Sequence, residues 1–106
     1  TPAVAGYDRG CAYTIAKAAL LGLTKHIASE YGRVGIRAYT LALGNIETST
    51  TKAALLDTYD RLAEESPAGR WGKPSEVAGV ISVLCSDKMS FVNGQTIVVD
   101  GGTVML

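Results

Sequence analysis

The sequence lacks an excess of either charge, a long apolar run and a set of metal ligands. Ten basic and ten acidic side chains leave a formal net charge of zero over 106 residues. A nucleic-acid partner is not expected, because phosphate binding needs Lys and Arg in excess on one face. No uncharged apolar run approaches the roughly 18 residues that span a bilayer, so no membrane partner is expected either. Because no basic-then-apolar leader is present, we expect a cytoplasmic protein.

Cysteine and histidine are scarce, which limits redox and metal chemistry. The chain has two cysteines, Cys11 and Cys85, no CxxC spacing, and a single histidine, His26. A metal site would need at least one more good ligand, so no metal is predicted. We expect the two cysteines to be small buried side chains in a reducing compartment. Apolar residues make up 47% of the chain, which predicts one packed domain.

The hydrophobic pattern predicts helices that alternate with buried strands. Helices are expected over 12–31, 52–65 and 74–86, strands over 36–43 and 96–100, and a loop of small and hydroxyl residues over 44–51. The strands show little polar alternation, which is typical of parallel strands covered on both faces. The order helix, strand, two helices, strand predicts an α/β fold with a βαβ unit. Two strands leave an edge and apolar helix surface uncovered, so this unit is expected to be part of a larger sheet.

Tyr13 and Lys17 form the most informative motif, YTIAK. Residues four apart on a helix lie on one face and can reach a shared ligand. A tyrosine hydroxyl is a poor acid or base near neutrality, since its usual pKa is about 10. A fixed ammonium nearby favours the phenolate, and such a pair can exchange a proton with a substrate oxygen. A tyrosine and a lysine at this spacing are more often a half-buried tyrosine beside a surface lysine than a catalytic pair. The catalytic interpretation therefore depends on the surrounding sequence.

Four sequence blocks supply that context, in order along nearly the whole chain. They are YTIAKAALLGLTKHIASEYG, GIRAYTLALGNIETST, RWGKPSEVAGVISVLCSD and SFVNGQTIVVDGG. These resemble, respectively, the YxxxK helix, the IRVNxxxPGxxxT strand and loop, the RxGxPEEVAxxxxFLxSD segment and the SxxxTGQxxxVDGG ending of the short-chain dehydrogenase/reductase family. The resemblance implies that residues 1–106 are the C-terminal segment of a Rossmann-like domain, the C-terminal part of a doubly wound parallel sheet that is incomplete on its own.

The resemblance also implies roles for five residues. Tyr13 would be the general acid/base at a carbonyl or alcohol oxygen, and Lys17 would support it and hydrogen-bond the nicotinamide ribose, so both would contact the cofactor. Gly44, Ile46 and Thr48 match the loop that holds the nicotinamide, with the backbone at Ile46 and the hydroxyl at Thr48. The implied cofactor is NAD or NADP, and the implied substrate is a small carbonyl or alcohol compound. Without the resemblance, Thr48 would be expected to be a solvated loop hydroxyl.

The sequence departs from the family pattern in several places. Leu43 replaces the proline before the loop, Tyr39 replaces the strand asparagine, and Ser75 stands where a glutamate is common. The family's catalytic serine falls about a dozen positions before the tyrosine, at or just before Thr1. No GxGxxG run follows a strand anywhere. The full cofactor site is therefore expected to be absent from these residues, and NAD cannot be distinguished from NADP.

Two functions fit this sequence. The first is an NAD(P)-dependent oxidoreductase. This chain would be one part of that enzyme and would be inactive on its own. The second is a non-catalytic, self-associating fragment or interaction module. The predicted helix over 12–31 is apolar nearly all round, and the strand over 36–43 has an open edge. We therefore expect a homo-oligomer, or an association with a missing N-terminal half.

The apolar residues of the predicted helix over 52–65 allow two interpretations. In the family this region covers the substrate, so Leu55, Leu56 and Tyr59 would either line a pocket or pack in the core. Trp71 is expected to pack rather than to bind a ligand.

Overall fold

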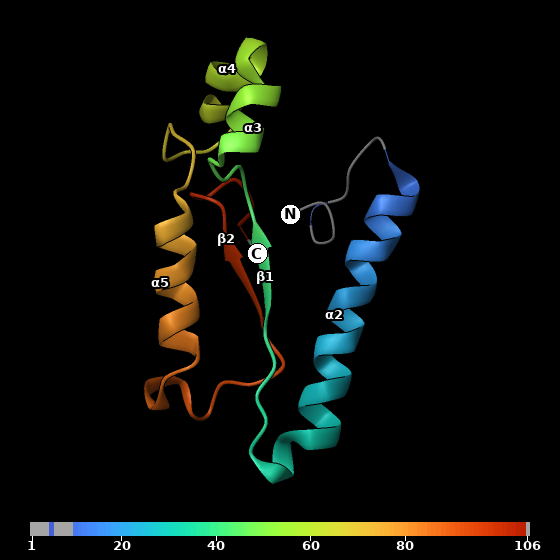
Figure 1. Cartoon of the computed structure of the whole chain (residues 1–106). Helices are drawn as coiled ribbons and strands as arrows, with labels where there is room; N and C mark the ends of the chain where they lie inside the picture. The colour runs from blue at the N-terminus through green and yellow to red at the C-terminus, as the bar shows by residue number, and fades with distance from the viewer. Residues whose placement is uncertain (1–4, 6–9, 106) are drawn as a thin grey trace.

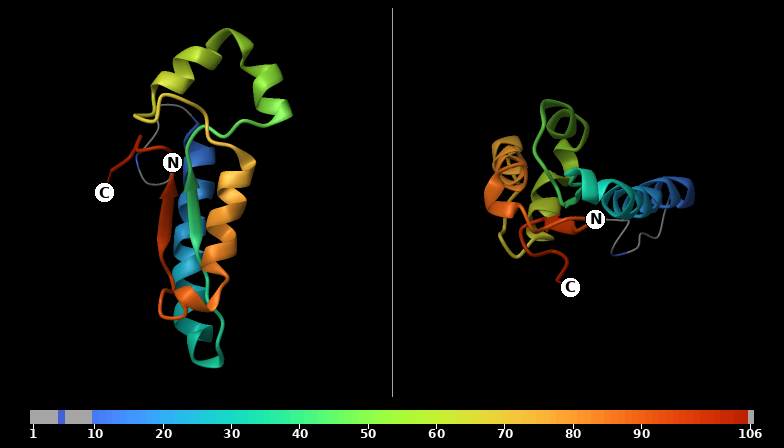
Figure 2. Two further views of the ribbon diagram at one scale, coloured as in Figure 1. Left: turned by 90° about the vertical axis from the view of Figure 1, so that its left-hand side faces the viewer. Right: turned by 90° about the horizontal axis from the view of Figure 1, so that it is seen from below.

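The computed structural model describes residue 5 and residues 10–105, and it shows two short parallel strands between two long helices (Figure 1). In chain order the main elements are α2 (Cys11–Tyr31), β1 (Thr40–Leu43), α3 (Ser49–Ala54), α4 (Tyr59–Glu64), α5 (Pro74–Leu84) and β2 (Thr96–Val99). Helices α2 and α5 lie on opposite sides of the strand pair, and α3 and α4 extend beyond its carboxyl end (Figures 1 and 2). The predicted α/β class with a small, incomplete parallel sheet is confirmed.

The two strands pair in parallel, from Thr40 opposite Thr96 to Leu43 opposite Val99. The predicted first strand, over 36–43, is longer than the observed one, since residues 36–39 are not part of the ladder. Their partner is the turn before β2: the Ala38 N–H donates to Asn93 Oδ1 at 2.8 Å, and the Gly94 N–H donates to the Ala38 carbonyl at 2.9 Å. The turn therefore satisfies both backbone groups of Ala38.

The single helix predicted over 52–65 is wrong, since the structure has two short helices there. Helix α3 begins at Ser49, three residues earlier than predicted, and ends at Ala54. A 3₁₀ turn over Leu56–Thr58 separates it from α4. Thr58 contributes to the break, because its N–H and its hydroxyl both donate to the Leu55 carbonyl, at 3.0 and 3.4 Å. Such side-chain bonds offer the backbone an alternative to a continuous helix.

Helix α5 begins as the sequence predicts. Pro74 occupies the first turn, where its missing N–H costs no hydrogen bond. Glu76 accepts a hydrogen bond from the Lys73 N–H at 2.8 Å, which caps the helix. The helix ends at Leu84 rather than Ser86, and a 3₁₀ turn follows over Asp87–Met89.

Helix α2 reaches the sheet through one polar contact and few buried side chains. The hydroxyls of Thr24 and Thr40 lie 2.6 Å apart and join α2 to β1. Thr24 is the buried residue of this helix, whereas Ile15 and Leu23 are more than half exposed. The uncovered apolar surface predicted from the sequence is therefore present on α2 within the described part of the chain.

The buried core is small for a chain of this length. Among the described residues only Ala42, Trp71 and Leu84 are buried apolar side chains. The radius of gyration is 15.2 Å, against roughly 13 Å for an ordinary domain of 100 residues. Within residue 5 and residues 10–105, no helix combines the length and apolar content that crossing a membrane requires.

The expectation that both cysteines are buried is wrong. Cys11 and Cys85 are free and exposed. Cys11 is the first residue of α2 and Cys85 follows the last residue of α5, so both lie at helix ends. The small core does not extend to either position.

Candidate functional site

The predicted site residues gather at one end of the structure. Residues 44–48 leave the carboxyl end of β1, and α2 begins at the same end and runs back along the strands (Figure 1). Ligands of open α/β sheets bind outside the carboxyl ends of the strands. The arrangement therefore places the five sequence-predicted residues at the end where such a site is expected.

Tyr13 and Lys17 lie together in the first turns of α2. The Lys17 Nζ stands 5.4 Å from the centroid of the Tyr13 ring, on the same helical face. Tyr13 is 55% exposed, so the residue is accessible from solvent. Gly10 is the N-cap of the helix, and its carbonyl accepts the Thr14 N–H at 2.9 Å. No hydrogen bond among the described residues joins this pair to the loop that follows β1.

Gly44 occupies a position where Asp100, the residue after β2, leaves no room for a side chain. Its N–H donates to the Val99 carbonyl at 3.0 Å and so extends the ladder by one bond. A Cβ at Gly44 would stand 2.6 Å from the Asp100 Cβ and 2.7 Å from the Asp100 Cα. Asp100 in turn accepts the N–H groups of Gly102 and Val104, which fixes the turn after β2. The glycine is therefore required by the packing of the two strand ends.

Ile46 belongs to a short second pairing beside the sheet. It forms an isolated parallel bridge with Gly72. The Gly72 N–H donates to the Asn45 carbonyl at 2.9 Å, and the Glu47 N–H donates to the Gly72 carbonyl at 2.8 Å. A side chain at Gly72 would collide with Ile46, since its Cβ would stand 2.7 Å from Ile46 Cδ1. The loop after β1 is thus held by the segment before α5.

Thr48 is the N-cap of α3. Its hydroxyl accepts the Thr51 N–H at 3.1 Å and lies 2.9 Å from the Thr51 hydroxyl, while the Thr48 N–H donates to Thr51 Oγ1 at 2.8 Å. This reciprocal capping fixes the Thr48 side chain. A hydroxyl has one donor and two acceptor positions, so one hydrogen-bonding position remains at Thr48. Thr48 is exposed, but it is a helix cap rather than a freely solvated loop hydroxyl.

Tyr59 and Trp71 form an aromatic pair next to the loop that follows β1. Their rings stack with centroids 4.8 Å apart and planes 6° from parallel. The Trp71 Nε1–H donates to the Tyr59 carbonyl at 2.9 Å, and the Tyr59 hydroxyl donates to the Glu47 carboxylate. This hydrogen bond lowers the pKa of Glu47 and raises that of Tyr59. Trp71 is 5% exposed, which agrees with the expectation that it packs.

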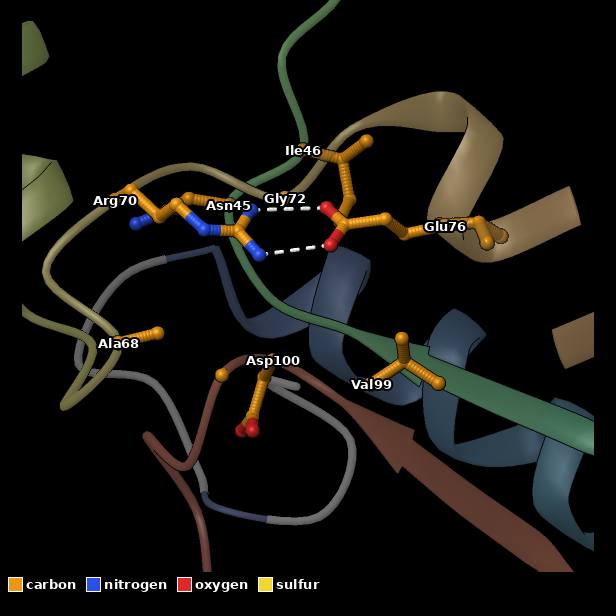
Figure 3. A pocket seen from close by; sticks show the side chains of 10 residues that line it. Asn45, Ile46, Ala68, Arg70, Gly72, Glu76, Val99 and Asp100 are labelled. Atoms are coloured by element: carbon orange, nitrogen blue, oxygen red, sulfur yellow. Dashed lines mark hydrogen bonds and ion pairs between the residues drawn. The ribbon is translucent and has the colours of Figure 1, made fainter. Parts of the chain in front are cut away.

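Arg70 and Glu76 close a small hollow beside the loop (Figure 3). The guanidinium binds the carboxylate through two bonds of 2.7 and 2.9 Å. These bonds, with the Lys73 N–H, lower the pKa of Glu76 to about 2. The hollow measures about 120 Å³, well below the roughly 300–1,000 Å³ of a small-molecule pocket. The Asp100 carboxylate points away from the ion pair (Figure 3), and the other two charged groups that line the hollow, Arg70 and Glu76, bind each other.

Sequence reasoning missed three of these contacts. The capping pair at Thr48 uses a threonine three residues later instead of the glutamate that marks a usual capping box. The Arg70 and Glu76 contact joins a loop to a helix, and the Tyr59 and Trp71 stack joins a helix to that loop. A spacing rule such as i, i+4 on one helix finds neither.

Parallel strands joined through helices, with an exposed tyrosine and lysine pair at their carboxyl end, define a Rossmann-like α/β protein. Residues 2–104 match the protein family described as enoyl-(acyl carrier protein) reductase. This chain belongs to the short-chain dehydrogenase/reductase family.

Known relatives agree in sequence and in structure. The chain is 42% identical over 92 residues to gluconate 5-dehydrogenase of Gluconobacter oxydans, covering 85% of this chain and 35% of that protein. A short-chain dehydrogenase/reductase of Brucella melitensis superposes with a TM-score of 0.89 at 36% identity, covering 99% of this chain and 42% of that one. A 4-hydroxyisoleucine dehydrogenase complexed with NADH superposes with a TM-score of 0.77 at 33% identity, covering 87% of this chain and 39% of that one. The chain spans about a third of the length of the curated relatives it matches.

Proposed function

We propose that this chain supplies the proton-transfer and nicotinamide side of an NAD(P)-dependent oxidoreductase that acts on a small carbonyl or alcohol compound. The observation that carries the proposal is the exposed Tyr13 and Lys17 pair at the carboxyl end of the sheet. Family membership supports oxidoreductase chemistry in general. The neighbouring 4-hydroxyisoleucine dehydrogenase, which is complexed with NADH, supports a nicotinamide cofactor.

The described residues fit one end of such a cofactor. Lys17 offers an ammonium donor, and Thr48 keeps one hydrogen-bonding position on a fixed, exposed side chain. The hollow beside Ile46 is too small to hold a dinucleotide. The sequence also contains no Gly-rich run that would cradle a pyrophosphate. We infer that the pyrophosphate and adenosine are bound by residues outside this chain.

The proton chemistry falls to the pair on α2. A bound nicotinamide cofactor supplies the hydride acceptor or donor. In reduction the Tyr13 hydroxyl gives its proton to the substrate oxygen. In oxidation the deprotonated Tyr13 oxygen takes the proton from the alcohol oxygen of the substrate. The Lys17 ammonium favours the negative charge that develops on the tyrosine oxygen. Gly44 and Ile46 hold the loop in place so that Thr48 faces the same end of the sheet.

A chimera tests this assignment. Residues 10–105 replace the matching segment of the Gluconobacter oxydans gluconate 5-dehydrogenase, which provides the remaining two-thirds of a domain. We expect turnover that falls at least about 100-fold with Tyr13→Phe and with Lys17→Met. Tyr31→Phe is the matched control, because it removes the same hydroxyl at the far end of α2 and should leave turnover unchanged. A chimera that stays active with Tyr13→Phe would contradict the proposal.

A self-associating module is the second candidate, and the exposed face of α2 favours it. Ile15, Leu20 and Leu23 are 64%, 45% and 52% exposed on this helix. Several large apolar side chains exposed on one helix favour an interaction site. A homo-oligomer in a reducing, cytoplasmic environment accords with this surface and with the two free cysteines.

Native mass spectrometry of the 106-residue chain, isolated together with any bound companion, separates the two candidates. A longer companion chain bound to the 11.1 kDa species would support the enzyme, whereas multiples of 11.1 kDa alone would support the module. In the second case, Leu23→Glu should shift the multiples toward the monomer, and Val34→Glu, at a 74% exposed position beyond α2, should not.

A further inference from the structure

The segment formed by α3 and α4, residues 49–64, extends beyond the strands and needs anchors to hold it there (Figure 2). Both of its helices are tied to the loop before it. The Asn45 side chain donates to the Leu62 carbonyl at 3.0 Å, and Lys52 lies 3.5 Å from the Glu47 carboxylate. Both of these contacts involve exposed or partly exposed groups, which hold a position weakly by themselves.

Tyr59 stands out because one residue contacts both flanking loops through three different groups. Its hydroxyl donates to Glu47, next to Thr48 in the loop after β1. Its ring stacks on Trp71, and its carbonyl accepts the Trp71 Nε1–H, in the loop before α5. The same two loops are also joined directly, because the Glu47 N–H donates to the Gly72 carbonyl. Tyr59 therefore lies where the segment and both loops meet.

We infer that Tyr59 is a positioning residue that holds the α3–α4 segment against the loop carrying Thr48, with Glu47 and Trp71 as its two anchors. Trp71 is the rigid anchor, since it is buried and hydrogen-bonded. Glu47 is the adjustable anchor, since it is partly exposed and also faces Lys52. Loss of the Glu47 contact would let the segment open locally while the aromatic stack and the sheet persist.

The effect on catalysis rests on the proposed function, but the contact itself does not. In the chimera, Tyr59→Phe should lower kcat/KM about threefold to tenfold, because the loop that bears Thr48 is held less firmly. The test of the positioning role uses readouts that need neither cofactor nor turnover, so the failure of either idea is recognised separately.

Limited trypsin digestion of the 106-residue chain is the direct test. Arg61 lies in α4 and Lys25 lies in α2, so one digestion reports on the segment and on a remote helix. Each cleavage rate is measured by mass spectrometry and divided by that of a peptide of the same sequence. Tyr59→Phe should speed cleavage at Arg61 about threefold to tenfold and leave cleavage at Lys25 unchanged. Tyr31→Phe, the matched control, should change neither rate.

Two substitutions of Glu47 separate positioning from general stability. Glu47→Ala should reproduce the effect of Tyr59→Phe, whereas Glu47→Gln should restore slow cleavage because its amide oxygen still accepts the Tyr59 hydroxyl. Trp71 is the single tryptophan of the chain, so its fluorescence reports the stack. It should change strongly with Tyr59→Leu and little with Tyr59→Phe.

Three results would overturn the inference. The first is a wild-type chain cleaved at Arg61 as fast as the free peptide, since the segment would then not be held at all. The second is an Arg61 rate that Tyr59→Phe leaves unchanged. The third is an equal increase at Arg61 and Lys25, which would mean that Tyr59 contributes only to the stability of the whole chain.

Discussion

Gly44 and Asp100 stand so close together at the strand ends that a single methyl group on Gly44 would lie 2.6 Å from the Asp100 Cβ. Both residues directly follow strands, and the Gly44 N–H continues the ladder to the Val99 carbonyl. Their contact fixes the direction in which the loop toward Thr48 leaves the sheet. A glycine that matches a cofactor-binding motif is here also a packing requirement.

Gly44→Ala should therefore destabilise the fold without touching any ligand. The added Cβ would force the backbone of Asp100 to move, and such overpacking costs about 1–3 kcal/mol. Gly79→Ala is the matched control, because nothing lies within 4 Å of a Cβ at that position of α5. It should stabilise the chain by about 0.5–1 kcal/mol, as alanine favours a helix over glycine. Chemical denaturation followed by circular dichroism measures both; equal stability of the two variants would refute the packing argument.

Trp71→Ala should be among the most damaging single changes in this chain. The side chain is 5% exposed, stacks on Tyr59, and belongs to a core with few other buried apolar residues. Removal of a buried tryptophan costs about 3–5 kcal/mol, which is a large share of the stability of a small domain. Phe91→Ala is the control, since Phe91 is fully exposed and its loss should be close to neutral. Denaturant midpoints by circular dichroism would show the contrast.

Thr24→Val should loosen α2 from the sheet. The change keeps the shape of the side chain but removes the 2.6 Å contact with the Thr40 hydroxyl, and leaves that hydroxyl without this partner. The expected loss is about 1 kcal/mol. Thr50→Val changes the same group at an exposed position of α3 and should have little effect. Hydrogen exchange of the α2 amides is the measurement, and unchanged protection in Thr24→Val would count against the contact.

Glu76 should make part of the stability acid-sensitive. Two bonds from Arg70 lower its pKa to about 2 in the folded chain, against a usual value of about 4.5. A lowered pKa means that the folded state holds the carboxylate better than the unfolded state does. Its contribution is therefore present above about pH 4.5 and is lost as the pH falls toward 2.

The variant Glu76→Gln tests whether this stability is lost as the pH falls. The thermal midpoint of wild type should fall more steeply than that of the variant between pH 4.5 and pH 2, and the difference should shrink in high salt because the pair is exposed. Glu64→Gln removes a carboxyl of α4 that forms no salt bridge within residues 10–105, and its profile should follow wild type. Parallel profiles for wild type and Glu76→Gln would contradict the prediction.

The sequence predicted those elements that depend on local chemistry. Apolar runs at 36–43 and 96–100 indicated strands, and their lack of alternation indicated parallel pairing, which residues 40–43 and 96–99 form. The predicted burial on both faces is wrong for these strands, since only Ala42 is buried and the other strand residues are partly exposed. Pro74 and Glu76 marked the start of α5, because each has a favourable place in a first helical turn. The close approach of Tyr13 and Lys17 followed from helical spacing alone.

The parts that the sequence did not predict depend on contacts between distant residues. The break between α3 and α4 arises where Thr58 bonds back to Leu55, which a smooth apolar stripe conceals. The exposure of both cysteines depends on how little of the chain covers the helix ends. The roles of Gly44, Ile46 and Thr48 toward a cofactor came from family resemblance and stay predictions, although all three positions lie at the expected end of the sheet.

The pairing of β1 with β2 has a consequence for how this chain folds. Thr40 and Thr96 are partners although they stand about half the chain length apart. The intervening residues must close a long loop before the first bond between the strands forms, and that closure costs entropy in advance of any gain. Helices such as α2 and α5 form from neighbouring residues within microseconds, whereas the sheet must wait for a rare encounter. We therefore expect the meeting of these two four-residue strands to be the slowest step of folding. Mutations inside the strands should then slow folding more than they speed unfolding.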